Sequence, residues 1–95
     1  MKSLPNFKFL LFVAGPTQNS TEAIANLNAI CRAHLLGRYQ IEIIDVFKAP
    51  ERALAAAVFM TPMLLKTAPG PQLRIVGSLS RTRPVLHAIG LDAAP

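Results

Sequence analysis

Residues 7–20 read FKFLLFVAGPTQNS, an apolar run followed by a loop with one glycine and one proline. The run, Phe7 to Val13, is almost entirely aromatic or aliphatic, as expected of a central parallel strand that is covered on both faces. The loop ends in polar residues, of which Asn19 or Ser20 can cap a helix. This stretch therefore predicts a strand, a loop and a helix that begins near Ser20.

The residues that follow extend this pattern to a β-α-β unit. Apolar residues recur at helical spacing as far as Leu35. The helix is expected to end at Leu36, because Gly37 stands where a left-handed residue would end it. Tyr39 to Phe47 is a second apolar segment, which we expect to run parallel to the first strand after a right-handed crossover. Asp45, near the end of this strand, is expected to orient the loop that follows.

The second half of the chain has weaker signals. Pro50 suits the first turn of an alanine-rich helix that lacks a clear polar face. Thr61-Pro62 breaks this helix, Pro69-Gly70-Pro71 suits a hairpin turn, and Ser80 can cap a last helix. The predicted elements are a helix over 51–59, strands over 63–66 and 73–77, and a helix over 81–89.

Length and composition predict one α/β domain over residues 1–95. A chain of this size buries only about 60 to 65% of its unfolded surface. Because 52% of the residues are hydrophobic and 16% are charged, a disordered chain is excluded and a dimer or tetramer is expected. The apolar run near the start is too short to span a membrane and no leader pattern precedes it, which predicts a cytoplasmic protein.

Charge is distributed unevenly along the chain, whose net charge is +5. After Arg52 the only acidic residue is Asp92, whereas four basic residues follow: Lys66, Arg74, Arg81 and Arg83. This half should present a basic surface to nucleic acid or to an acidic protein face. Phe59 is its only aromatic residue, which favours a protein partner over nucleic acid.

The cysteine and histidine residues of the chain give little support for redox or metal chemistry. The single cysteine, Cys31, excludes a dithiol active site and is expected to pack in the core. His34 and His87 have no further ligand at metal spacing, so no metal or cofactor is predicted. Ser20, at a helix start, leaves one alternative open, because its hydroxyl could stabilise the thiolate of bound glutathione.

The order β-α-β, α, β-β-α, with a proline immediately before the third strand, resembles the thioredoxin fold. In that fold the matching proline is typically cis, and Thr61-Pro62 is the corresponding pair here. The sequence leaves its isomer open. Redox members carry Cys-x-x-Cys after the first strand, where this chain has Gly15 to Ser20 without cysteine.

Within this fold, the chain resembles the KaiB proteins of the bacterial circadian clock, whose first strand and loop read close to YVAG-x-T-x-NS. The matching residues lie in order and without gaps over nearly the whole chain. They are Phe12-Val13-Ala14-Gly15, Thr17, Asn19-Ser20, Ile44-Asp45-Val46, Lys48, Pro50, Thr61-Pro62, Leu64, Lys66, Pro69, Pro71, Ile75, Gly77, Leu79-Ser80, Val85-Leu86 and Gly90-Leu91-Asp92.

The resemblance implies a non-enzymatic protein that binds the N-terminal ATPase ring of KaiC and modulates its phosphorylation and ATPase cycle. It also implies two folds with a shared β-α-β half. The second half takes either a resting arrangement, usually tetrameric, or a thioredoxin-like arrangement that binds the partner. Such bistability needs two packings separated by only a few kcal/mol.

The resemblance also assigns residues. Those expected to bind the partner are Lys48, Pro50, Glu51, Arg52, Lys66 and Arg74. Those expected to border the switching region are Thr61, Pro62, Gly77, Ser78 and Ser80. Three family carboxylates are replaced by Ser78, Arg81 and Arg83, which indicates a divergent member.

Two other functions share the predicted fold. One is the glutathione-binding protein that uses Ser20, and the other is a stand-alone homologue of a clock histidine-kinase sensor domain. The absence of a kinase region in these 95 residues disfavours the latter.

Overall fold

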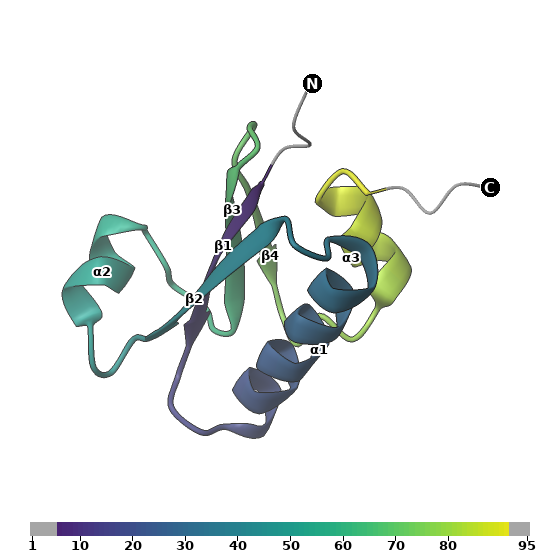
Figure 1. Cartoon of the computed structure of the whole chain (residues 1–95). Coiled ribbons are helices and arrows are strands. Elements are labelled where there is room, and N and C mark those ends of the chain that lie inside the picture. Colours follow the sequence, from purple (N-terminus) through teal and green to yellow (C-terminus); the bar gives the residue numbers. More distant parts are fainter. Residues whose placement is uncertain (1–5, 92–95) are drawn as a thin grey trace.

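The chain forms a four-stranded sheet with helices on both faces in the computed structural model, which describes residues 6–91 (Figure 1). The sheet order is β2-β1-β3-β4, in which β1 pairs parallel with β2 and β3 pairs antiparallel with β1 and β4. The elements are β1 (Phe7–Val13), α1 (Gln18–His34), β2 (Tyr39–Asp45), α2 (Pro50–Ala55), β3 (Met63–Ala68), β4 (Leu73–Val76) and α3 (Thr82–Ala88). The second half therefore has the thioredoxin-like arrangement, one of the two that the resemblance implies.

The main core lies between the sheet and the pair α1 and α3 (Figure 1). Alternate residues of β1 point to this face because successive side chains of a strand point to opposite sides. Leu11 on β1 and its neighbour Leu64 on β3 are fully buried there, and Leu27 of α1 packs in the same cluster. This placement confirms the expected apolar face of the first helix, and it buries Cys31 completely.

A smaller core lies on the opposite face, toward α2. Phe12, Ile44, Met63 and Leu65 form it, with partly buried residues from the segments around α2. Only Ala53 of α2 is buried, so this helix contributes little apolar surface to the sheet. The two faces are therefore packed unequally.

The start of α1 corrects one sequence prediction. The helix begins at Gln18, and Thr17 is its N-cap, with a side-chain oxygen that accepts a hydrogen bond from Ser20 N. Asn19 and Ser20 lie inside the first turn instead. The threonine three residues before Ser20 satisfies one of the free N–H groups of the helix start, which sets this boundary.

The predicted helix over 51–59 is shorter, since α2 ends at Ala55. Val58 N donates to Ala53 O and Ala57 N donates to Leu54 O, the paired hydrogen bonds of a Schellman motif. Ala57 occupies the left-handed position with φ +55°, where glycine is usual. The apolar Val58 then returns the chain to the smaller core, which overrides the helix propensity of the alanines.

The remaining elements follow the predicted order with shifted ends. The hairpin between β3 and β4 contains Pro69-Gly70-Pro71, as expected. Thr61-Pro62 is cis, as are Ala68-Pro69 and Gly70-Pro71. The last helix begins at Thr82 with Arg81 as its N-cap residue, and no side chain caps it, so the predicted Ser80 cap is wrong.

Candidate partner-binding surface

Asp45, at the end of β2, fixes the turn that leads to α2. Its Oδ1 accepts hydrogen bonds from Phe47 N at 2.9 Å and from Gly15 N at 3.4 Å. Its carbonyl oxygen accepts from the backbone N–H groups of Lys48 and Ala49. One carboxylate thus joins the loops after β1 and β2, which confirms the expected role of Asp45 and directs the chain into α2.

Two arginines tie α2 to both edges of the sheet. Arg52 of α2 forms a bidentate ion pair with Glu42 of the edge strand β2, with Nη2 at 3.0 Å from Oε1. Arg74 of the other edge strand, β4, donates to the carbonyl oxygens of Ala56 and Ala57 at the C-terminal end of α2. A short helix with one buried side chain is therefore held mainly by polar contacts.

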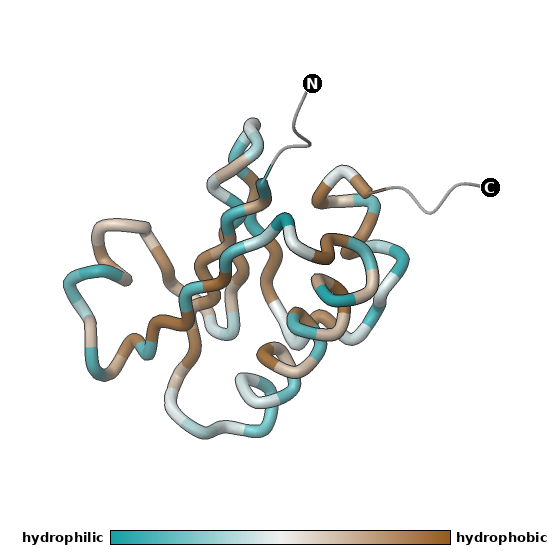
Figure 2. Tube along the Cα trace, viewed as in Figure 1, coloured by the Kyte–Doolittle hydropathy of each residue, from teal (hydrophilic) through white to brown (hydrophobic). Residues whose placement is uncertain are grey.

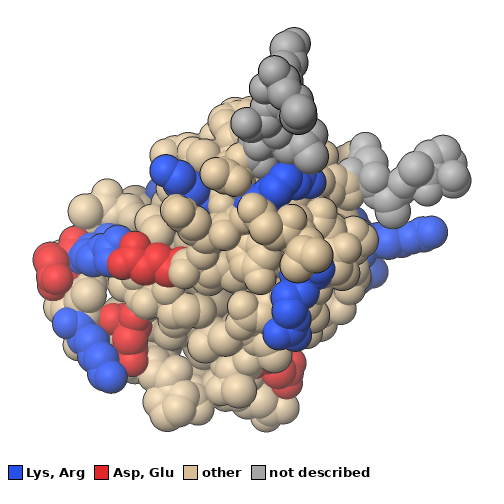
Figure 3. Space-filling view, in the orientation of Figure 1, with Lys and Arg blue, Asp and Glu red and all other residues tan. Residues whose placement is uncertain are grey.

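The ion pair shifts the pKa of both of its members. The hydrogen bond from Arg52 lowers the pKa of Glu42, and the same bond raises the pKa of Arg52. In Figure 3, acidic and basic side chains gather over the α2 side of the molecule, whereas basic residues dominate elsewhere in this view. The α2 side is therefore mixed in charge rather than uniformly basic.

Large apolar side chains are exposed in and beside α2. Leu54 is 76% exposed and Phe59 is 87% exposed, and Phe47 and Met60 are also largely open. Figure 2 shows hydrophobic residues in the segments before and after this helix. None of these residues is among the predicted site residues, although the missing polar face of the predicted helix was the signal for them.

Five of the six expected partner-binding residues lie around α2. Lys48, Pro50, Glu51 and Arg52 are all exposed at the start of α2, and Arg74 contacts its other end. We use "α2 surface" below for Phe47, Lys48, Glu51, Arg52, Leu54, Phe59 and Met60.

Lys66 does not belong to this group, and its expected position on the surface is wrong. It is only 4% exposed and lies on the opposite face of the sheet. Its Nζ donates to Ile89 O at 3.3 Å and lies 5.7 Å from the centre of the Phe7 ring. Pleating explains this, because Lys66 alternates with Leu65 and faces α3, where a carbonyl and an aromatic ring receive its charge.

The residues expected to border the switching region meet between β3, β4 and α1. Gly77 N donates to Pro62 O at 2.9 Å, which joins the start of β3 to the end of β4. Asn26 of α1 donates from Nδ2 to Ser78 O at 2.8 Å. Thr61 is half-buried beside Pro62, whereas Ser80 is exposed. The first hydrogen bond joins two parts of the second half, and the second one fastens the second half to α1.

The loop of residues 15–20 offers no exposed reactive group. Ser20 is 1% exposed and its Oγ accepts a hydrogen bond from Ala14 N at 3.1 Å, so its hydroxyl serves the loop rather than a bound thiol. Burial raises the pKa of the Cys31 thiol to about 11, which keeps it protonated at neutral pH.

Within residues 6–91 no group of three His, Cys, Asp or Glu side chains is placed to hold a metal ion. No helix in that range is long and apolar enough to cross a membrane.

Solved structures with this fold include thioredoxins and the N-terminal domain of SasA. The N-terminal domain of Synechococcus elongatus SasA matches with a TM-score of 0.74 at 17% identity, covering 100% of this chain and 93% of that one. A chloroplastic thioredoxin z matches with a TM-score of 0.74 at 18% identity, covering 94% and 80%. At these identities the matches establish the thioredoxin-like fold alone.

Sequence relatives are more specific. Circadian clock protein KaiB3 of Synechocystis sp. is 42% identical over 85 residues, covering 90% of this chain and 81% of the relative. Circadian clock oscillator protein KaiB of Thermostichus vulcanus is 44% identical over 82 residues, covering 86% and 74%. The family model of the KaiB domain matches residues 10–91. The chain therefore belongs to the KaiB family.

Proposed function

We propose that this chain is a non-enzymatic clock or signalling protein that binds a KaiC-type ATPase through the α2 surface. Binding would modulate the ATPase and phosphorylation cycle of that partner. The proposal includes a single cytoplasmic domain over residues 1–95. Membership of the KaiB family and relatives named as circadian clock proteins support it.

The observation that carries the proposal is the composition of the α2 surface. Protein interfaces combine an apolar centre with a polar periphery. Here Leu54 and Phe59 supply exposed apolar area, and Lys48, Glu51 and Arg52 surround the start of the same helix. Because Arg52 is already paired with Glu42, its guanidinium is oriented before a partner arrives, which reduces the entropy that binding costs.

The test is size-exclusion chromatography with the cognate KaiC-type ATPase, loaded in turn with ATP and ADP, together with its ATPase rate. We expect a complex in at least one nucleotide state and a changed ATPase rate. Leu54→Ser should weaken the complex at least roughly tenfold, because it removes an apolar anchor from the interface. The absence of a complex in both states would contradict the proposal.

Leu36→Ser is the matched control. Leu36 is 80% exposed, similar to Leu54, and follows α1 on the other side of the sheet. This variant should bind as the wild type does. Equal weakening by both variants would place the interface elsewhere.

Self-association is part of the same proposal. The exposed apolar residues of the α2 surface would be covered by a second copy in a dimer or tetramer when the ATPase is absent. Sedimentation velocity at increasing protein concentration should show this assembly, and Leu54→Ser should weaken it. A monomer at every concentration would remove this part of the proposal.

A further inference from the structure

β4 is an edge strand with a free side. In the sheet order β2-β1-β3-β4, no strand within residues 6–91 pairs with its outer edge. Gly77 N donates to Pro62 O, and Leu64 is the register partner of Ile75. Because hydrogen bonds alternate along an antiparallel pair, the backbone groups of Arg74 and Val76 point away from β3. They remain available to an added strand.

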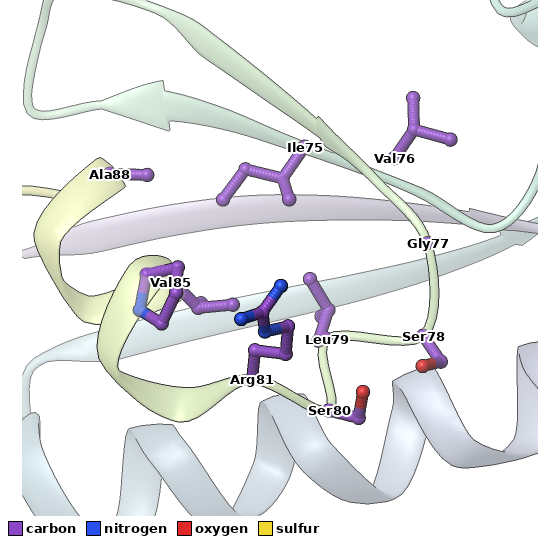
Figure 4. A pocket seen from close by; sticks show the side chains of 10 residues that line it. Ile75, Val76, Gly77, Ser78, Leu79, Ser80, Arg81, Val85 and Ala88 are labelled. Atoms are coloured by element: carbon purple, nitrogen blue, oxygen red, sulfur yellow. The ribbon is translucent and has the colours of Figure 1, made fainter.

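A groove runs beside this edge, between β4, the loop 77–81 and α3. Figure 4 shows Ile75 of β4 facing Val85 and Ala88 of α3 across it. The groove has a volume of about 460 Å³. Its lining is largely apolar, with Ile75, Leu79 and Val85 as the main side chains. An extended chain that pairs with β4 would therefore place alternate side chains over an apolar floor.

The charge around the groove is positive. Arg81 lines it, and no hydrogen bond or ion pair of its side chain is found within the part of the chain that the structure describes. No aspartate or glutamate occurs between Ala53 and Leu91. On the neighbouring helix α1, Glu22 already accepts a hydrogen bond from Gln18. Within residues 6–91 the groove thus has a cation that lacks a carboxylate partner.

We propose that the β4 edge and this groove bind an extended acidic segment of a partner protein, which adds a fifth strand to the sheet. Backbone hydrogen bonds to Arg74 and Val76 supply affinity, and apolar side chains fill the groove. A carboxylate of the segment pairs with Arg81, which selects acidic over basic sequences. A second copy of this chain fits less well, because the same groove of the copy also brings an arginine and no carboxylate.

The probe is a fluorescein-labelled peptide of sequence Glu-Thr-Val-Thr-Val-Thr-Glu, and binding is measured by fluorescence polarisation. Its valines and glutamates share one face of an extended strand, and the glutamate at each end serves either strand direction. We expect saturable binding to the full chain. The same peptide with lysine in place of glutamate should bind at least roughly tenfold more weakly.

Val76→Pro tests the strand edge. Proline removes the N–H of residue 76, which points outward, and leaves the pairing with β3 intact, so the variant should fold. It should lose peptide binding, whereas Val76→Thr should retain it within about twofold. Circular dichroism melting verifies that both variants fold. Wild-type affinity in a folded Val76→Pro variant would overturn the proposal.

Arg81→Glu tests the groove cation, and Arg83→Glu is its control with the same change in net charge. Arg83 is exposed on α3 but does not line the groove. We expect roughly tenfold weaker binding for Arg81→Glu and less than about twofold for Arg83→Glu. Equal effects would indicate a nonspecific charge attraction and overturn the proposal.

Two further measurements separate this surface from other interactions. Val76→Pro should still bind the KaiC-type ATPase, because the α2 surface is unchanged, so failure of either proposal leaves the other testable. Sedimentation of the chain alone should show no assembly that Val76→Pro abolishes. An assembly with that sensitivity would identify a second copy as the occupant of the edge and overturn the acidic-segment proposal.

Discussion

The β1-α1-β2 unit and the segment around α2 differ in how far their apolar residues are buried. In the first, large side chains such as Phe9, Leu11 and Leu27 are almost completely buried between sheet and helix. In the second, Leu54 and Phe59 remain exposed, and arginine contacts hold α2 to the sheet edges. Apolar packing therefore stabilises one region, whereas the other keeps apolar surface that a partner can cover.

The largest difference between the two regions should appear when one leucine is truncated in each. Leu27→Ala should lower the free energy of unfolding by about 3 kcal/mol, because it leaves a cavity in the main core. Leu54→Ala should change it by less than about 0.5 kcal/mol, since Leu54 is exposed. Urea unfolding followed by circular dichroism measures both. Similar losses would mean that α2 is packed as firmly as α1.

A smaller effect is expected at the left-handed positions that end α2 and α3. Ala57 follows α2 with φ +55°, whereas Gly90 occupies the same place after α3 with φ +91°. Ala57→Gly should raise the free energy of unfolding by about 1 kcal/mol, and Gly90→Ala should lower it by a similar amount.

The C-terminal ends of α2 and α3 can be compared directly, because both have the hydrogen bonds of a Schellman motif. Thermal and urea unfolding provide the measurement. Destabilisation by Ala57→Gly would show that the end of α2 is not left-handed in solution.

The smallest effect concerns the ion pair between Glu42 and Arg52. Because Arg52 lowers the pKa of Glu42, the stabilising contribution of the ion pair is complete above the unfolded pKa of glutamate. It is lost as pH falls through the lowered pKa of Glu42 in the folded state. The free energies of unfolding of the wild type and of Glu42→Gln should therefore differ at pH 7 and converge in acid. Added salt should also reduce the difference. A difference that persists in strong acid would contradict this pairing.

Local patterns predicted the β1-α1-β2 unit closely. The apolar run FKFLLFV, the helical spacing before Gly37 and the second apolar segment indicate elements that the structure confirms, with ends shifted by a few residues. Prediction was weaker for α2, because alanine propensity favours a helix through Phe59 whereas Val58 packs against the sheet. Propensity is a local quantity, and tertiary contacts override it.

The candidate site divides in the same way. The charged residues at the start of α2 are exposed, as the sequence predicts for a binding surface, and whether they contact a partner stays a prediction. Lys66 lies in the interior because sheet pairing and pleating direct it toward α3. The basic second half therefore presents fewer free cations than its sequence suggests, since Arg74 also contacts the end of α2.

The family, the β-α-β frame and the absence of a Cys-x-x-Cys pair after β1 follow from the order of the residues alone, because they depend on residue identity and position. The folded arrangement is needed to see which cations are buried, which apolar residues are exposed, and which edge of β4 has no partner strand within residues 6–91. Those properties depend on the face and register of each strand. A shift of one residue in register would exchange the two faces, and composition is the same in either case.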